Sequence, residues 1–446
     1  LWNFTDITQE TDVGIMQSSP AVADGMVYVG DRNKNLYAIF ANNGSLKWKK
    51  TLSDDVYGSP AVADGMVYVG SGDWLNVPGT FYAMDAGTGS LVWQKNYSSG
   101  VESSPLVYNG SVIVGRVDWN VSAYNAKTGE ERWSYRTAGT VPDGMALSNG
   151  RVFFATQDSN IFALDATTGE KVWDYKNSST AYGPAFTKQS SPAVAYGRVY
   201  IGGSGGVYAF DEYNGDFLFR FLRDSTGFEG SPAAANGLIY IGTERGAGII
   251  PNAIYAFNAD LTVNWFRNTT GDLQMFSGPA VANGVVYITD DSYLYAWNAT
   301  TGEPIWEFHP PNLGGTYSSP AVQNGVVYFG TRYGLYAVGT YHSPSAKISI
   351  YKDGSWYMDM NGDGVWNTGD KNYGYGAPLW TPVVGDWNHD GRTEIGVYRD
   401  GAWYLDYDAT GWWSCGDKNF GYGAPGWTPV VGDWNGNGYD KAGAYK

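Results

Sequence analysis

Cysteine, histidine and basic residues are scarce in this chain of 446 residues, and each scarcity excludes a class of protein. The single cysteine, Cys415, rules out a disulfide framework within the chain. We interpret it as an unpaired thiol in an aromatic-rich loop, with an intermolecular disulfide as the alternative. The three histidines take part in no Ser/His/Asp or zinc-binding pattern, and no phosphate-binding loop is present.

The charge balance and the lack of long apolar runs limit the partners. With a net charge of −16, the chain lacks the clustered Lys and Arg that nucleic-acid binding needs, so we expect no nucleic-acid partner. No apolar run approaches the roughly 18 to 20 residues that cross a bilayer, so we expect no membrane span. The chain begins with Leu1 rather than Met. This start suggests a removed leader and predicts an extracellular or cell-surface protein.

Glycine and aromatic residues are abundant, with 61 Gly, 19 Trp and 35 Tyr, which favours an all-β, turn-rich fold. Residues 18–48 have the pattern of four short strands, with Asp24-Gly25 and Asn43-Gly44 at two of the turns. The first turn glycine recurs at intervals of 40 to 47 residues, at Gly25, Gly65, Gly110, Gly150, Gly197, Gly237, Gly284 and Gly325. Eight copies of a four-stranded unit at this spacing predict the blades of a β-propeller.

Each copy has a recognisable start and end. Seven copies open with a proline at the first strand position: Pro20, Pro60, Pro105, Pro192, Pro232, Pro279 and Pro320. Seven end in a large aromatic residue: Trp48, Trp93, Trp133, Trp173, Phe219, Trp265 and Trp306. The eighth copy stops at Val338 without a closing strand. Leu1 to Phe4 is the missing strand, so we expect residues 1–338 to form an eight-bladed β-propeller closed by the N-terminal strand around Trp2.

The stretches YAMDAGTGSLVW (82–93), FALDATTGEKVW (162–173) and YAWNATTGEPIW (295–306) carry a family resemblance. They resemble the tryptophan-docking repeat of the quinoprotein-like (PQQ-like) β-propellers. That family includes quinoprotein alcohol dehydrogenases and the scaffold lipoprotein of the outer-membrane assembly machine. Two copies depart from the pattern, because Phe219 replaces tryptophan and residues 258–264 lack the Thr-Gly turn.

The resemblance also sets an expectation about the cofactor. In the enzymes of this family a vicinal cysteine pair, an acidic calcium ligand and a catalytic Asp surround the quinone. This chain has one cysteine, and it lies outside the propeller repeats. We therefore expect no PQQ, no catalytic residues and no enzymatic activity.

The propeller repeats carry eight Asn-x-Ser/Thr sequons, which are candidate N-glycosylation sites if the protein is exported. The alternative is that these asparagines are only turn residues. The sequons are at Asn3, Asn43, Asn96, Asn109, Asn120, Asn177, Asn268 and Asn298.

A different repeat follows the predicted linker at residues 339–345. Residues 381–406 match 428–446, and residues 350–359 match 397–406, both at an offset of 47. Residues 346–446 are similar to the VCBS/FG-GAP-like repeats of cell-surface proteins, whose Asp-rich loops bind calcium. We expect a small β module of two repeats. Its many tryptophans predict packing between the repeats, or else surface tryptophans for carbohydrate or a partner.

Two loop types in this module place oxygen-bearing side chains at alternate positions, as calcium sites require. The first loop type has Asp359, Asn361, Asp363 and Asp370, and its copy has Asp406, Asp408 and Asp417. The second has Asp386, Asn388, Asp390 and Glu394, and its copy has Asp433, Asn435 and Asn437. We expect structural calcium at these loops, with metal-free Asx-turns as the alternative.

These features predict a non-enzymatic extracellular or cell-surface protein with a structural or adhesive role. The propeller then serves as a platform, and the calcium-stabilised module mediates self-assembly into a filament, sheath or surface layer. The partners expected are the same protein, other surface proteins or a glycan. A soluble protein- or glycan-binding scaffold is the first alternative, and a PQQ-dependent oxidoreductase is the second.

Overall fold

The computed structural model describes residues 1–5, 18–73, 77–141, 143–176, 190–203, 205–222, 227–228, 230–243, 252–269, 277–290, 292–310, 318–339, 349–358, 371–385, 387, 394–407, 410–432 and 441–446. They belong to two compact units, Leu1–Tyr341 (unit 1) and His342–Lys446 (unit 2). Regular structure among these residues is entirely β, as the sequence predicts. No helix long and apolar enough to span a membrane occurs among them.

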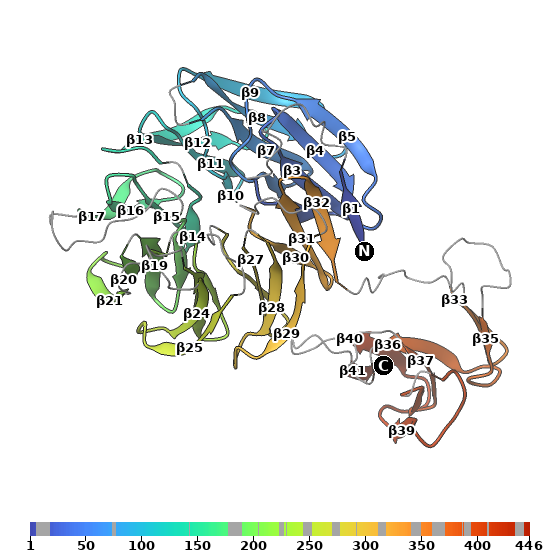
Figure 1. Ribbon diagram of the computed structural model, residues 1–446. Helices are drawn as coiled ribbons and strands as arrows, with labels where there is room; N and C mark the ends of the chain where they lie inside the picture. Colours follow the sequence, from blue (N-terminus) through green and yellow to red (C-terminus); the bar gives the residue numbers. More distant parts are fainter. Residues whose placement is uncertain are drawn as a thin grey trace. The chain divides into compact units, whose positions relative to one another are not determined.

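Unit 1 contains eight four-stranded antiparallel sheets, which stand around a common axis like blades (Figure 1). From the inner to the outer strand, the first four sheets are β2 (Ala21–Ala23), β3 (Met26–Gly30), β4 (Asn35–Phe40), β5 (Leu46–Thr51); β6 (Ala61–Ala63), β7 (Met66–Ser71), β8 (Gly79–Asp85), β9 (Leu91–Tyr97); β10 (Leu106–Tyr108), β11 (Ser111–Gly115), β12 (Asn120–Asn125), β13 (Glu131–Arg136); and β14 (Ala146–Ser148), β15 (Arg151–Ala155), β16 (Ile161–Asp165), β17 (Lys171–Tyr175).

The other four sheets, in the same order, are β18 (Ala193–Ala195), β19 (Arg198–Gly203), β20 (Gly206–Asp211), β21 (Phe217–Leu222); β22 (Ala233–Ala235), β23 (Leu238–Gly242), β24 (Ala253–Asn258), β25 (Val263–Asn268); β26 (Ala280–Ala282), β27 (Val285–Thr289), β28 (Leu294–Asn298), β29 (Pro304–Phe308); and β30 (Ala321–Gln323), β31 (Val326–Thr331), β32 (Gly334–Val338), β1 (Trp2–Phe4). Middle strands are buried over most of their length because sheets pack on both of their faces, whereas most residues of the outer strands are exposed or half-buried.

The N-terminal strand β1 is the outer strand of the eighth sheet, where it pairs antiparallel with β32 (Figure 1). Trp2 lies opposite Ala337, and its indole N–H donates to the carbonyl of Ala41 in the first sheet at 2.9 Å. Phe4 packs in one apolar cluster with Tyr37 of the first sheet. The N-terminal segment therefore links the last sheet to the first.

A chain of hydrogen bonds between serines joins neighbouring inner strands just before the opening prolines. At each of these boundaries a backbone N–H of one sheet donates to a serine hydroxyl of the next sheet. The pairs are Ser19–Ser59 at 3.0 Å, Ser59–Ser104 at 3.0 Å, Gly144–Ser191 at 2.9 Å, Ser191–Ser231 at 2.9 Å, Gly278–Ser319 at 2.8 Å and Ser319–Ser19 at 2.9 Å. At the two other boundaries the following sheet has Gly144 or Gly278, which has no hydroxyl group to accept the bond.

At the outer rim, six tryptophans lie against the turn of the following sheet: Trp2, Trp48, Trp93, Trp133, Trp173 and Trp265. The indole N–H donates to a turn carbonyl, as in Trp48 to Ala86 at 3.0 Å and Trp93 to Ala126 at 2.9 Å. The ring covers a turn glycine with positive φ, and a Cβ on Gly89 would come within 2.8 Å of the Trp48 ring. The Thr-Gly turn therefore requires glycine for two reasons. Its backbone is left-handed at this position, and the indole that covers it leaves no room for a Cβ.

The two departures that the sequence shows occur at corresponding positions of neighbouring sheets. Phe219 of β21 stands at the docking position of the fifth sheet and is 36% exposed. In the sixth sheet Leu261 adopts φ 61° at the position that glycine takes in other turns, and its side chain lies in the apolar cluster of Tyr200 and Phe257.

Unit 2 contains three antiparallel sheets. Their strands are β33 (Ser349–Lys352), β34 (Ser355–Met358), β35 (Lys371–Tyr373); β36 (Thr381–Gly385), β37 (Glu394–Arg399), β38 (Ala402–Leu405), β39 (Lys418–Gly421); and β40 (Thr428–Gly432), β41 (Lys441–Tyr445). Trp356, Trp387 and Trp403 are buried, which fits packing between the repeats. Trp412 and Trp413 are 59% and 53% exposed, so both sequence-based alternatives describe part of the tryptophan set.

Two turn glycines test the packing of the tryptophan rings at the outer rim: Gly89, which lies under the Trp48 ring, and Gly65, which no side chain covers. Gly89 and Gly65 have nearly the same φ, +68° and +73°, but a Cβ on Gly65 meets nothing within 4 Å. Gly65→Ala is expected to cost only the backbone strain, about 1 kcal/mol. Gly89→Ala is expected to cost a further ~1–3 kcal/mol, because the Trp48 ring must move. Urea unfolding of both variants measures the difference, and equal losses would contradict the packing argument.

Candidate functional site

The turns between second and third strands, and the connections between sheets, lie at the same end of the eight sheets because the strands alternate in direction. We call this end of unit 1 the loop face. Its third-sheet part consists of residues 116–119 and the connection that follows β13. Backbone hydrogen bonds join the two segments, from Thr137 N to Trp119 O at 2.8 Å and from Val141 N to Arg116 O at 3.3 Å.

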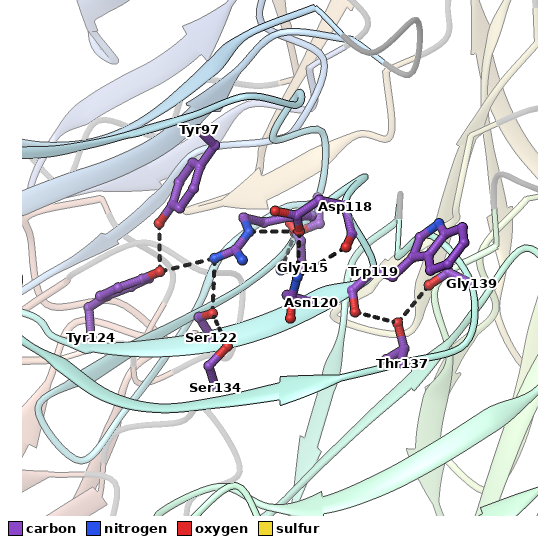
Figure 2. Close-up of polar contacts among 12 residues, drawn as sticks. Tyr97, Gly115, Asp118, Trp119, Asn120, Ser122, Tyr124, Ser134, Thr137 and Gly139 are labelled. Carbon is purple, nitrogen blue, oxygen red and sulfur yellow. Dashed lines mark hydrogen bonds and ion pairs between the residues drawn. The ribbon is translucent and has the colours of Figure 1, made fainter.

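Arg116, directly after β11, takes part in a buried polar network on this face, and Figure 2 labels its partners Asp118, Ser122 and Tyr124. Its Nε donates to Asp118 Oδ1 at 3.0 Å, and one terminal nitrogen donates to the Ser122 hydroxyl at 3.0 Å and the Tyr124 hydroxyl at 3.2 Å. The guanidinium carbon lies 4.3 Å from the centroid of the Tyr97 ring. The two tyrosine hydroxyls are 2.6 Å apart. The network therefore fixes the Arg116 side chain on every side.

Burial and the carboxylate of Asp118 together determine which groups of this network are charged. Burial lowers the pKa of Arg116, but the hydrogen bond and the charge of Asp118 outweigh it and raise the pKa overall. Burial, and then the hydrogen bond to Tyr124, raise the pKa of the Tyr97 phenol. Arg116 thus stays a cation and Tyr97 stays neutral across the physiological pH range. The network has the character of a structural support, since its polar groups bond to one another.

Trp119 is the side chain that this network presents to solvent. It is 45% exposed and has φ 69°, a left-handed conformation that is rare for a bulky residue. The Thr137 hydroxyl lies 2.9 Å from the Trp119 carbonyl oxygen. The guanidinium carbon of Arg136 lies 5.7 Å from the Trp119 ring. The loop therefore holds an indole beside a cation on the loop face.

The same turn occurs in two other sheets with different residues at the left-handed position. Lys34 in the first sheet has φ 66°, and Ser159 in the fourth has φ 63°. Sequence reasoning missed Trp119, although aligning Asp118-Trp119-Asn120 with Asp158-Ser159-Asn160 shows the tryptophan as the departure from the turn. Only the tertiary structure shows that the indole is exposed.

Parts of the predicted calcium loops are described in unit 2. Asp406 accepts backbone hydrogen bonds from Thr410 N at 3.0 Å and Gly411 N at 2.8 Å, and Asp417 accepts from Tyr407 N and Ser414 N, both at 2.8 Å. Glu394 is buried and accepts from Trp387 N at 2.9 Å. The other predicted ligands lie outside the described residues: Asp359, Asn361, Asp363, Asp370, Asp386, Asn388, Asp390, Asp408, Asp433, Asn435 and Asn437.

The sequon asparagines differ in how their side chains are used. Asn3, Asn43, Asn96, Asn109 and Asn268 are exposed, and Asn177 lies outside the described residues. Asn298 Oδ1 accepts two backbone hydrogen bonds of its turn. The Asn120 amide nitrogen donates to both the carbonyl and the carboxylate of Asp118, and Ser122 of the same sequon is fully buried. Glycosylation of these residues stays a prediction.

Comparison with protein families finds a match to the family described as outer membrane protein assembly factor BamB, over residues 1–76, 72–260 and 251–371. No curated protein matches the chain. Among solved structures, BamB from Moraxella catarrhalis is 18% identical with a TM-score of 0.57, covering 74% of this chain and 98% of that one.

Two solved enzymes are also similar in fold. Quinohemoprotein alcohol dehydrogenase from Comamonas testosteroni is 17% identical with a TM-score of 0.60, covering 79% of this chain and 78% of that one. A europium-containing methanol dehydrogenase is 15% identical with a TM-score of 0.57, covering 80% and 83%. At these identities the likeness is one of fold, and it supports the predicted PQQ-like propeller.

These findings overturn two expectations. The prediction of a structural or adhesive protein is wrong, because the family match and the similar structures indicate an assembly factor or an oxidoreductase. The expectation that no PQQ is bound is contradicted by the quinohemoprotein and methanol dehydrogenases. The expectation about PQQ relied on the single cysteine, which bears on one site and does not identify the family.

The described residues lack the groups that a quinone site of this family requires. The vicinal cysteine pair that the family resemblance implies cannot form, since Cys415 is the single cysteine and lies exposed in unit 2. Within the described ranges, no group of three or more His, Cys, Asp or Glu side chains could hold a metal ion. The serine hydroxyls beside the inner strands already accept backbone hydrogen bonds. The described residues therefore do not fit a quinone, and they support no reaction step that involves one.

Mutations can separate the contribution of Trp119 to stability from that of the Arg116 network below it. Trp119→Gly relieves the left-handed strain and loses the contact with Arg136, so the free energy of unfolding is expected to stay within about 1 kcal/mol of wild type. Asp118→Ala leaves the buried Arg116 without its carboxylate, and we expect a loss of about 1–3 kcal/mol. Chemical denaturation compares the two variants, and a larger loss for Trp119→Gly would show that the indole is part of the support.

Proposed function

We propose, on the premise that the chain belongs to the family described as outer membrane protein assembly factor BamB, that it is a non-enzymatic scaffold that binds proteins during assembly. Its unit 1 acts as a closed eight-bladed propeller that works outside the cytoplasm. The loop face around Trp119 contacts the partner. A propeller suits this role because rigid sheets hold loops from distant parts of the sequence in one surface.

The observation that carries the proposal is the exposed Trp119 in a left-handed backbone conformation. Holding a bulky residue in such a conformation costs roughly 1–3 kcal/mol, and residues of this kind concentrate at binding and active sites. Tryptophan and arginine are also the side chains that contribute most to protein–protein affinity. Trp119 on the loop and Arg136 at the end of β13 supply both side by side, above the network that holds the loop.

The test identifies the partner and then measures the contribution of Trp119. A photo-crosslinking amino acid placed at 119, in the cells that make this protein, is expected to label a protein partner. With that partner purified, Trp119→Ala is expected to weaken binding at least about thirtyfold, the effect of a residue that contributes ~2 kcal/mol.

Lys34→Ala is the matched control, because Lys34 occupies the same turn position in the first sheet. It is expected to change affinity less than about twofold, within the usual range for a peripheral residue. Absence of any crosslinked protein would refute the scaffold function. Dye-linked dehydrogenase activity of the protein supplied with PQQ and calcium would assign it to the oxidoreductases instead.

Unit 2 is proposed to be a VCBS/FG-GAP-like module that calcium stabilises through the loops beginning at Asp359 and Asp386. The chemistry of those loops supports the proposal, since carboxylate and amide oxygens at alternate positions are the ligands that calcium prefers. The loop from Asp406 to Asp417 is different. Both of its described carboxylates accept backbone N–H groups, and we propose that these bonds stabilise this loop without a metal.

Calorimetry of the full chain separates the two loop types. We expect calcium to raise, and a chelator to lower, the unfolding temperature of unit 2. Asp359→Asn is expected to reduce this calcium response. Asp406→Asn is expected to lower stability by about 1–2 kcal/mol equally with and without calcium, because it weakens hydrogen bonds to the backbone. Unfolding of unit 2 that does not respond to calcium would contradict the metal proposal.

A further inference from the structure

The outer strand of the fifth sheet, β21, differs in composition from the other long outer strands of unit 1. Its sequence is FLFRFL, so Arg220 is its only polar residue. The strands β5, β9, β13 and β25, each six or seven residues long, carry three or four polar or charged residues. Proteins place such residues on edge strands to prevent pairing with other chains. β21 lacks this protection.

The strand is also accessible. It is the last strand in the sheet order β18-β19-β20-β21, so only one of its two edges is paired within that sheet. Phe217 is 42% exposed, Phe219 36% and Leu222 51%. Phe219 occupies the docking position of the repeat, but the repeat does not require the other apolar residues of the strand, because β5 and β13 form with polar residues at many of the same positions.

An apolar row continues from this strand to the next sheet. The Phe221 ring lies 5.6 Å from the Tyr255 ring, which stacks on Phe266 of β25 at 5.3 Å. Phe266 is 48% exposed. Phe221 also lies 4.8 Å from Phe257. β21 is therefore held firmly on its inner side, while exposed apolar side chains line the strand and lead to Phe266.

The charges near the strand favour an acidic partner segment. Arg220 is exposed in the middle of β21, and the Arg198 guanidinium lies 5.5 Å from the Phe219 ring. Hydrogen bonds to Thr262, and also the charge of Arg198, lower the pKa of Asp260, so Arg198 already lies near a carboxylate and Arg220 is the charged residue of β21 itself. A second copy that paired with this strand in the register centred on Arg220 would bring arginine beside arginine, which disfavours that register.

We propose that β21 binds an extended segment of a partner protein, which adds to the fifth sheet as a further strand. This inference rests on the proposed scaffold function and names a second contact for its partner. Backbone hydrogen bonds from the open edge supply affinity, and exposed side chains select the sequence. The segment alternates apolar and polar residues, and one of its carboxylates faces Arg220.

The probe is a fluorescently labelled eight-residue peptide that alternates valine and threonine and has one central glutamate. Fluorescence anisotropy measures its binding to the full chain, and hydrogen exchange read by mass spectrometry locates it. We expect binding that slows amide exchange in residues 217–222. Replacing the glutamate by lysine is expected to weaken binding at least about tenfold, and two prolines in the peptide are expected to abolish it.

The paired substitution Phe217→Lys/Leu222→Lys is expected to weaken peptide binding at least about tenfold. Because the Phe217 ring lies 5.6 Å from the Phe210 ring, some loss of stability is expected, and the binding assay is run at a temperature where calorimetry shows the variant folded. Leu91→Lys/Val92→Lys is the matched control on β9, where these residues are 53% and 49% exposed, and it is expected to have little effect. Equal effects of the two pairs, protection elsewhere in the chain, or no binding would overturn the proposal.

Two outcomes separate this inference from the scaffold function. If a partner crosslinks at position 119 and binds the β21 variant as tightly as wild type, the strand-addition site fails and the scaffold function stands. If light scattering shows that the chain self-associates and the β21 variant abolishes that association, the occupant is a second copy, and the partner-segment proposal is wrong.

Discussion

The contact on which unit 1 depends is the indole of one sheet lying against the glycine turn of the next. Trp48 and Trp93 at this contact are less than one-tenth exposed, and each donates its N–H to a turn carbonyl. Burying such a ring stabilises the fold by about 1.5–3 kcal/mol, and the hydrogen bond adds ~1 kcal/mol. Since the contact repeats from sheet to sheet, neighbouring sheets are held at a nearly constant angle.

Inner and outer contacts have different roles. The serine hydrogen bonds near the axis join neighbouring inner strands, and the bond from Ser319 to Ser19 joins residues 300 positions apart in the sequence. The indole contacts at the rim tolerate local change. Where Leu261 takes the place of the turn glycine, the neighbouring sheet carries Phe219 instead of tryptophan, and Phe221 packs against Tyr255 and Phe257. The outer strand with this altered docking residue is β21, which is also the proposed binding surface.

The loop face shows how a repeated turn acquires a special residue. Lys34, Trp119 and Ser159 occupy one position of one turn, and their backbones have nearly the same φ. The turn can change its side chain because the strands on either side of it fix its backbone. Trp119 differs from the others in having a buried arginine network below it, which keeps the loop from collapsing onto the indole.

The sequence alone determined the all-β class, the number of repeat copies and the β strand at Trp2, because these follow from the period of turn glycines and docking aromatics. It could not identify the serine chain, since a serine before proline has no distinctive signal until neighbouring strands meet. It also misjudged function, because the single cysteine was taken to exclude the cofactor and the Asp-rich loops were taken to indicate a structural or adhesive role, whereas the family match is to an assembly factor. Only the tertiary structure decided that Trp119 and β21 are exposed. Exposure depends on which side chains from other sheets cover a residue, and those neighbours are distant in sequence.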